Sequence, residues 1–219
     1  MIETISLVGL LPKVFEGCEQ EPPVCTSEVW LKDVELLRGR RYLISAESGT
    51  GKSSLCSFIY GNRTDYNGKI FFDGRDTRGL GIDERCDFRR RSLSLLPQEM
   101  RLFPELSVME NIRLKNDLTG FRSDREIFDL LDELEIAGKA DSKAAFLSIG
   151  QQQRVAIVRA LCQPFDFLIL DEPVSHLDAR NNAAAATMVQ READRQGAAI
   201  VATSVGNHLK LTDYTLIRL

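Results

Sequence analysis

The chain contains the stretch Ala46-Glu47-Ser48-Gly49-Thr50-Gly51-Lys52-Ser53, and this stretch decides the fold expected for it. It follows a strand-like segment, Arg41 to Ser45, and precedes Lys52 to Tyr60, in which apolar residues recur at helical spacing. A Gly-rich loop that ends in Lys-Ser between a strand and a helix is the pattern of a phosphate-binding loop. The sequence therefore predicts a nucleotide site on an α/β core.

Each residue type in this loop suits phosphate chemistry. Gly49 and Gly51 let the backbone curl so that successive N–H groups point at phosphate oxygens. The helix N-terminus adds partial positive charge, Lys52 reaches the β- and γ-phosphates, and the Ser53 hydroxyl ligates Mg²⁺. Such loops usually begin with glycine, and Ala46 is expected to be tolerated there with a negative φ. The predicted nucleotide-binding residues of this segment are Glu47, Ser48, Gly49, Thr50, Gly51, Lys52, Ser53 and Ser54.

Composition predicts a soluble protein without a general attraction to nucleic acid. The chain has 219 residues, of which 43% are hydrophobic and 27% charged, and its net charge is −4. No apolar run approaches the ~20 residues of a membrane-spanning helix, and the N-terminus lacks the basic start of a signal peptide. The five cysteines form no C-x-x-C pair, which argues against metal binding and for free thiols in a reducing compartment. We expect a cytoplasmic location and a solvated Arg89-Arg90-Arg91 cluster.

The order of strand-like segments predicts two kinds of sheet in an α/β fold. The early segments are separated by turns, including Asn67-Gly68 and Asp73-Gly74, which favours antiparallel ribbons. The later segments alternate with helices, which favours a parallel sheet. The predicted strands are Thr4 to Val8, Val29 to Leu36, Arg41 to Ser45, Lys69 to Phe72, Leu93 to Leu96, Phe167 to Asp171, Ala199 to Thr203 and Tyr214 to Arg218.

Helix signals concentrate between these two groups of strands. Ser107 to Glu110 and Ser123 to Glu126 both have the Ser-x-x-Glu form of a capping box. An apolar face follows the second box, and Gly138 is expected to end that helix; the face consists of Ile127, Leu130, Leu131 and Leu134. The sequence thus predicts a helical subdomain at residues 99–146, inserted between the two parts of a nucleotide-binding core, 1–98 and 147–219.

Two carboxylates end a buried strand, Phe167 to Asp171. Adjacent buried acids are costly unless they have chemistry to perform. Asp171 is placed to hold Mg²⁺ through water, and Glu172 to orient and deprotonate an attacking water. A strand ending in Asp-Glu also serves as a simple strand stop, but the phosphate-binding loop upstream favours the catalytic interpretation.

The segment Leu147-Ser148-Ile149-Gly150-Gln151, followed by Gln152-Gln153-Arg154, predicts a helix through about Cys162 with an anion-binding N-terminus. At this point the chain resembles the ATP-binding subunits of ABC transporters, whose signature reads Leu-Ser-Gly-Gly-Gln, over residues 3 to 219. The Asp178-Ala179-Arg180-Asn181 stretch and the short helical insertion look most like the group that powers lipoprotein release and macrolide export. A long helix is expected after Asp178, closed by Gly197.

The resemblance implies a P-loop ABC-type ATPase domain with a parallel core sheet, an antiparallel β subdomain and a helical insertion. It also implies ATP and Mg²⁺ as ligands. Gln98, in Leu96-Pro97-Gln98, would add a Mg²⁺ ligand and sense the γ-phosphate. Ser148, Gly150 and Gln151 would complete the site of the opposite subunit in a head-to-tail homodimer or pseudo-dimer, and Asp178 would cap its helix and cross that interface.

The same resemblance implies a separate membrane-embedded transporter subunit as partner, and hence a peripheral place on the inner face of the cell membrane. The groove beside Gln98 would receive this partner through Arg101-Leu102-Phe103-Pro104. The alternative for Leu102 and Phe103 is packing inside the helical insertion. Phe15 occupies roughly the position of the aromatic residue that stacks on adenine, and an apolar core role for it is equally open.

Three positions depart from the family pattern. Ala46 replaces a glycine, Ile149 replaces a signature glycine, and Ser204 stands where the family places its switch histidine. The predicted catalytic positions are Glu172, Lys52, Gln98 and Ser204. Because the last of these carries a serine in place of the histidine, we expect slow hydrolysis. His208, four residues later, offers an alternative histidine if Gly206 lets the loop bend.

The expected function is ATP hydrolysis in a dimer that opens and closes to drive a membrane transport or release complex. An alternative from a different class is a nucleotide-dependent scaffold that closes on ATP, barely hydrolyses it and regulates a membrane complex. Ile149 and Ser204 favour the scaffold, and Glu172 opposes it. A small phosphate-loop kinase is a third alternative, but it would not need the Leu-Ser-x-Gly-Gln segment or a strand ending in Asp-Glu-Pro.

Overall fold

The computed structural model describes all 219 residues and contains two sheets. The first is antiparallel, with the strand order β2-β1-β4-β5. The second is parallel, with the order β6-β7-β8-β3-β9. The strands are β1 (Thr4–Pro12), β2 (Asp33–Leu37), β3 (Arg41–Ser45), β4 (Tyr66–Phe72), β5 (Arg75–Asp76), β6 (Leu93–Leu96), β7 (Phe167–Asp171), β8 (Ala199–Ser204) and β9 (Thr215–Arg218). Both sheet types predicted from the sequence are confirmed.

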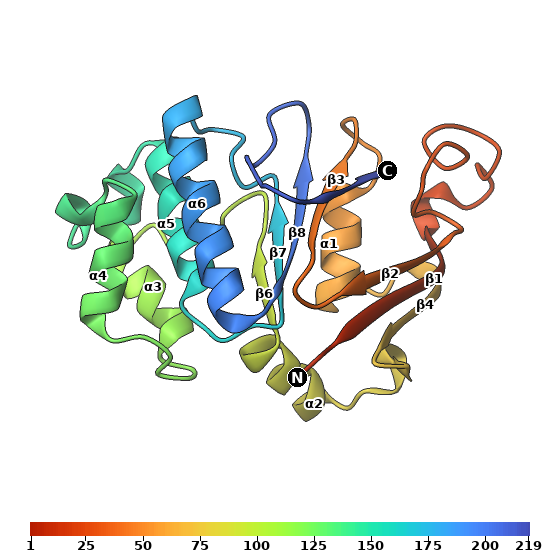
Figure 1. Cartoon of the computed structure of the whole chain (residues 1–219), viewed down its shortest axis with the longest axis horizontal. Helices are drawn as coiled ribbons and strands as arrows, with labels where there is room; N and C mark the ends of the chain where they lie inside the picture. Colours follow the sequence, from red (N-terminus) through yellow and green to blue (C-terminus); the bar gives the residue numbers. More distant parts are fainter.

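Helices cover both faces of the parallel sheet (Figure 1). Helices α3 to α6 lie on one side of it, and α1 lies on the other, between this sheet and the antiparallel one. The helices are α1 (Lys52–Tyr60), α2 (Ile82–Arg91), α3 (Val108–Asn116), α4 (Asp124–Glu133), α5 (Ile149–Leu161) and α6 (Ala179–Gln196), with short 3₁₀ turns η1 (Lys13–Phe15), η2 (Thr77–Gly79), η3 (Ala137–Lys139) and η4 (Ala144–Phe146). None of the helices combines the length and apolar character needed to span a membrane.

Strand β7 shows why the sheet lies at the centre. All five of its residues are buried, as expected for a parallel strand covered on both faces. Phe167 and Ile169 belong to the apolar cluster on the α1 side, while Leu168 and Leu170 belong to the cluster under α3 to α6. The predicted apolar face of α4 joins the second cluster, so the segment 99–146 shares a core with the sheet.

Several local predictions are confirmed. Ser107 and Ser123 each cap a helix in a reciprocal capping box with the glutamate three residues later. Asp178 caps α6, and Gly197 ends it in the left-handed conformation. The Asp73-Gly74 turn connects β4 and β5, with both residues at positive φ.

Three local predictions are wrong. Val29 to Lys32 are not part of a strand, because the Ser27 hydroxyl accepts hydrogen bonds from the N–H groups of Val29 and Trp30 and forms a turn there. Asn67-Gly68 is not a turn but lies inside β4, at a shift in register with β1. Gly138 does not end α4, which stops at Glu133 because Glu135 takes the left-handed conformation.

Helix α2 was not predicted. It contains none of the buried residues that give a helix its apolar stripe, and charged residues dominate its sequence, Ile-Asp-Glu-Arg-Cys-Asp-Phe-Arg-Arg-Arg. Helical periodicity therefore left no signal. The cluster Arg89-Arg90-Arg91 at its end is only partly solvated, contrary to the prediction. The Arg89 guanidinium donates hydrogen bonds to the carbonyls of Tyr60 and Gly61 at the C-terminal end of α1.

Candidate active site

The phosphate-binding loop connects the end of β3 to the start of α1, as the sequence predicts. Gly49 and Gly51 have φ values of +84° and +98°, which suit glycine, while Ala46 avoids the left-handed region. A Cβ added to Gly51 would lie 2.9 Å from the Trp30 ring and 3.3 Å from the Phe15 ring. Gly51 is therefore required both by its backbone conformation and by the aromatic side chains packed against it.

Trp30 supports this loop, and sequence patterns gave no signal for it. Its side chain is fully buried, and its indole N–H donates to the carbonyl of Thr50 over 3.0 Å. The Thr50 hydroxyl in turn donates to the carbonyl of Glu47 over 2.9 Å, which closes the loop on itself. These bonds fix the backbone whose N–H groups would face phosphate oxygens.

The loop borders an open pocket that brings together most of the predicted nucleotide-binding residues. The residues lining it are Val14, Phe15, Ser48, Gly49, Gly51, Lys52, Ser53, Ser54, Gln98 and Glu172. Phe15 is half-buried, with its ring centroid 6.5 Å from that of Trp30, so it both packs on the core and borders the pocket. Glu47 and Thr50 shape the loop from behind rather than line the pocket.

Lys52 is held between two oxygen atoms at the floor of the pocket. It is only 5% exposed, and its Nζ donates to the carbonyl of Glu47 over 2.6 Å and lies 3.7 Å from Glu172 Oε1. A buried cation needs such partners. The charged oxygens of a triphosphate would bind the Lys52 ammonium group more strongly than these two protein oxygens do. The ammonium group is therefore placed to leave Glu172 and pair with a phosphate oxygen.

Ser53 and Gln98 are the residues that fit a Mg²⁺ ion. The Ser53 hydroxyl donates to Gln98 Oε1 over 3.2 Å, so a hydroxyl oxygen and an amide oxygen meet beside the pocket. Both are hard oxygen donors of the kind that Mg²⁺ prefers. Phosphate oxygens and water would complete the coordination of the ion.

Asp171 lies behind this pair. Its side chain is buried and accepts a hydrogen bond from the Thr203 hydroxyl over 2.7 Å, and it does not line the pocket. Burial, together with the Asp171 carboxylate, raises the pKa of the Cys56 thiol well above its usual value, so that thiol stays protonated.

Glu172 adopts a left-handed backbone with φ +50°, which is uncommon for a residue with a side chain. Its N–H donates to the Thr203 hydroxyl over 3.1 Å, and its carbonyl accepts from Gln153 Nε2 over 3.0 Å. Thr203 therefore holds both acids of the strand end, through the side chain of Asp171 and the backbone of Glu172. Sequence reasoning missed Thr203 and Gln153, because their partners are 19 to 32 residues away.

The signature segment lies outside the pocket. Ser148 caps α5 in a reciprocal capping box with Gln151, and Gly150 packs so closely that a Cβ there would lie 3.0 Å from the carbonyl of His176. Ile149 is 52% exposed. None of these residues lines the pocket, so within one chain the structure does not bring the signature to the phosphate-binding loop.

Asp178 is also separate from the pocket. It caps α6, and the hydrogen bond from the backbone N–H of Asn181 lowers the pKa of its carboxyl. The carboxylate is thus ionised at the exposed start of α6.

Ser204 ends β8 as a buried side chain, and its carbonyl accepts a 3.3 Å hydrogen bond from the N–H of Ala46. It supports the phosphate-binding loop through its backbone and does not line the pocket. His208 is exposed and does not line the pocket either, although its carbonyl accepts from Asn182. The bend at Gly206, φ +72°, does not bring the imidazole back to the site.

A groove on the α3 side of the loop after Gln98 contains Phe103, which is 56% exposed. Leu102 is half-buried and packs against the core, whereas Phe103 is the more exposed of the two apolar residues, so the packing alternative describes Leu102 better than Phe103. The groove is lined by Leu95, Phe103, Leu114, Lys115, Arg159 and Ala160. Burial and the neighbouring Arg159 and Arg89 lower the pKa of Lys115 to about 8.

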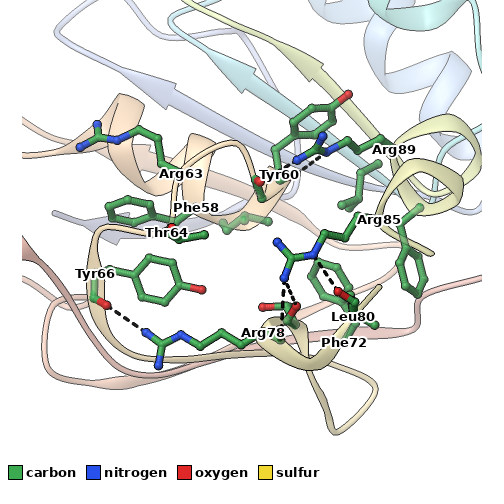
Figure 2. A pocket seen from close by; sticks show the side chains of 15 residues that line it. Phe58, Tyr60, Arg63, Thr64, Tyr66, Phe72, Arg78, Leu80, Arg85 and Arg89 are labelled. Atoms are coloured by element: carbon green, nitrogen blue, oxygen red, sulfur yellow. Dashed lines mark hydrogen bonds between the residues drawn. The ribbon is translucent and has the colours of Figure 1, made fainter. Parts of the chain in front are cut away.

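A second pocket, between α1, β4 and α2, is rich in arginine and aromatic side chains (Figure 2). Arg89 donates to the carbonyls of Tyr60 and Gly61 at the end of α1, and Arg85 donates to the carbonyl of Leu80 and to two carbonyls of η2. Arg78 donates to the carbonyl of Tyr66. The guanidinium groups therefore bond the elements together, and the pocket is a structural junction.

Comparison with known proteins agrees with this geometry. Residues 32–175 match the protein-family model described as ABC transporter. The chain is 35% identical over 176 residues to the macrolide export ATP-binding/permease protein MacB of Campylobacter jejuni, covering 78% of this chain and 27% of MacB. It is 35% identical over 148 residues to the lipoprotein-releasing system ATP-binding protein LolD 1 of Chlorobium chlorochromatii, covering 66% of this chain and 60% of LolD 1. The chain thus spans less than two thirds of each of these relatives.

Among solved structures, the dimeric post-hydrolysis state of the ATP-binding cassette MJ0796 bound to ADP and Pi superposes with a TM-score of 0.70 at 29% identity. The superposition covers 80% of this chain and 79% of that one. The phosphate-binding loop, the signature segment at Leu147 to Gln151 and the Asp171-Glu172 strand end all lie within the matched residues 32–175. The chain therefore belongs to the ABC transporter family, as an ATP-binding ATPase domain.

Proposed function

We propose that the chain binds ATP with Mg²⁺ and hydrolyses it in a head-to-tail dimer, and that this cycle drives a membrane-embedded transporter subunit. One observation carries the proposal: Lys52, Ser53, Gln98 and Glu172 meet at one pocket, while the signature residues of the same chain lie outside it. A site of this kind is complete only when a second signature closes over it. The MJ0796 cassette, which this chain resembles, is a dimer with ADP and Pi bound.

Within the pocket, each residue has a distinct task. The loop N–H groups and Lys52 bind and orient the β- and γ-phosphates. Ser53 and Gln98 would hold Mg²⁺, with the Asp171 carboxylate nearby, and the bound ion would neutralise charge on the phosphate oxygens. Glu172 accepts a proton from the attacking water at its carboxylate. Without nucleotide, the Lys52 ammonium group lies 3.7 Å from that carboxylate. When the ammonium group pairs with phosphate instead, Glu172 is free to act as base.

The second copy contributes its signature segment to the nucleotide. The capped N-terminus of α5 presents Ser148 and the N–H groups near Gly150 and Gln151 to the γ-phosphate of the opposite subunit. Asp178, ionised at the start of α6, lies in the loop that crosses this interface. Binding of two ATP molecules closes the dimer, and loss of the γ-phosphate opens it.

The membrane partner docks in the groove at Phe103, Leu114 and Lys115, beside the loop of Gln98. Exposed apolar side chains and a cationic floor suit an apolar segment with acidic groups. The chain would then lie on the inner face of the membrane, with residues 99–146 as the helical subdomain between the nucleotide and the partner. The membrane partner, not this chain, would select the transported substrate.

A scaffold with weak hydrolysis is the second candidate, because the buried Ser204 side chain leaves the pocket without the family's switch histidine. In this alternative the dimer still closes on ATP, and the closed state regulates a membrane complex.

Steady-state ATPase assays test the proposal with two variants. Lys52→Ala should abolish tight ATP binding in calorimetry, because the triphosphate loses its principal cation. Glu172→Gln should keep ATP affinity and lower kcat by roughly 10²-fold or more, the usual scale for loss of a general base. Unchanged hydrolysis in Glu172→Gln would overturn the assignment of the base, and hydrolysis absent from the parent itself would favour the scaffold.

A further inference from the structure

Gln153, in helix α5, forms hydrogen bonds through both polar atoms of its side-chain amide with the loop that contains Glu172. The side chain is completely buried. Its Nε2 donates to the carbonyl of Glu172 over 3.0 Å and to the hydroxyl of Ser175 over 3.2 Å, and its Oε1 accepts from the N–H of His176 over 2.9 Å. A buried amide with this many partners is held in one orientation, so it defines the position of the backbone it contacts.

The same face of α5 contacts this loop a second time. Gly150 lies one turn before Gln153, and a Cβ on Gly150 would stand 3.0 Å from the carbonyl of His176. The helix backbone and the loop backbone are thus in direct contact at Gly150 and joined by hydrogen bonds at Gln153. The N-terminal turn of α5 and the loop from Glu172 to His176 are therefore joined by direct packing and by hydrogen bonds.

Glu172 needs such support because of its backbone. A residue with a side chain keeps a left-handed φ of +50° only where surrounding contacts impose it. Two side chains hold the peptide groups on either side: Thr203 accepts from its N–H, and Gln153 donates to its carbonyl. With the bond from Gln153 removed, the peptide group after Glu172 is free to rotate, and the carboxylate near Lys52 loses its fixed direction.

We propose that Gln153 is a positioning residue for ATP hydrolysis that joins the two nucleotide sites of the dimer within one chain. It fixes the backbone of Glu172, the base at the chain's own nucleotide site. Through α5 it also couples the position of Glu172 to the contact between the signature segment and the nucleotide of the opposite subunit. This inference rests on the proposed function, in which Glu172 is the base and the signature contacts the opposite subunit's ATP. It assigns Gln153 no contact with nucleotide.

The first test replaces the amide with an apolar side chain of similar length. Gln153→Met should lower kcat by about 10²-fold, the scale of misplacing a catalytic group by about 1 Å, with KM for ATP changed by less than about threefold. Gln163→Met is the matched control. Gln163 lies just beyond the C-terminal end of α5, is also buried, and donates from its Nε2 to the carbonyl of Leu93. Equal kcat values in the two variants would overturn the proposal.

The second test uses pH to restore a donor. In Gln153→Glu the ionised carboxylate cannot donate to the Glu172 carbonyl, whereas the protonated acid can, and burial raises the pKa of the introduced group. The ratio of variant to parent kcat should therefore increase as pH falls from about 8.5 to 6. A ratio that stays flat across this range would contradict positioning through a hydrogen bond.

A double-mutant cycle identifies the group through which Gln153 acts. In the Glu172→Gln background, Gln153→Met should cause little further loss of the residual rate, because the base it positions is already gone. Full additivity of the two losses would overturn this proposal while leaving the proposed function intact. Parental activity in Glu172→Gln alone would overturn both.

Discussion

At the scale of single residues, the end of β8 governs the expected speed of hydrolysis. Ser204 is buried and does not line the pocket, and its hydroxyl is too short to replace an imidazole. We expect Ser204→His to raise kcat, by up to about 10²-fold, because a preorganised donor would stabilise charge that develops on the γ-phosphate in the transition state. Steady-state ATPase assays measure the change.

His208 supplies the control for this prediction. Its side chain is exposed and does not line the pocket, so His208→Ala should leave kcat nearly unchanged. A large loss of activity in His208→Ala would mean that His208 serves as the switch histidine, and the slow-site hypothesis would be wrong.

At the scale of elements, β4 depends on a glycine at its shift in register with β1. Gly68 has φ +85°, and a Cβ there would lie 2.3 Å from the carbonyl oxygen of Gly9. Gly68→Ala forces one of the two strands to move, so we expect a loss of unfolding free energy of about 3 kcal/mol, combining left-handed strain with steric overlap. Urea denaturation followed by circular dichroism gives this value.

Gly74 is the matched control, since it has a similar φ of +79° but open space where a Cβ would stand. Gly74→Ala introduces only the conformational strain, so its expected cost is about 1 kcal/mol. Similar costs for both variants would show that the close approach of the two strands does not constrain β4.

At the scale of the whole molecule, the separation of signature and phosphate-binding loop predicts ATP-dependent dimerisation. Glu172→Gln, loaded with ATP and Mg²⁺, should elute as a stable dimer in size-exclusion chromatography, because hydrolysis no longer removes the γ-phosphate that would join the two copies in the proposed dimer. ADP should leave the same variant monomeric.

A substitution in the signature provides the contrast. Adding Ser148→Arg to Glu172→Gln places a long side chain at the exposed helix start that would face the opposite nucleotide in the proposed dimer, so the dimer should be lost while ATP still binds to the monomer. A dimer that forms equally with ADP, or that survives Ser148→Arg, would contradict the head-to-tail arrangement.

Much of the fold and site was predictable from the sequence because the governing interactions are local. The phosphate-binding loop needs glycine at two positive φ values, and the capping boxes at Ser107 and Ser123 each join residues three apart. The buried strand before Asp171 shows as an apolar run. Such features depend on neighbours in sequence, and periodicity and residue type report them directly.

Only the tertiary structure decided what joins these local elements. The strand order β6-β7-β8-β3-β9, the support of the loop by Trp30, and the hold of Thr203 and Gln153 on Glu172 all depend on partners far away in sequence. The Asn67-Gly68 pair has the residue pattern of a hairpin turn, yet pairing with β1 keeps it inside a strand. A side chain reveals its distant partner only after the chain has folded, because that hydrogen bond or contact follows from packing and leaves no periodic trace in sequence.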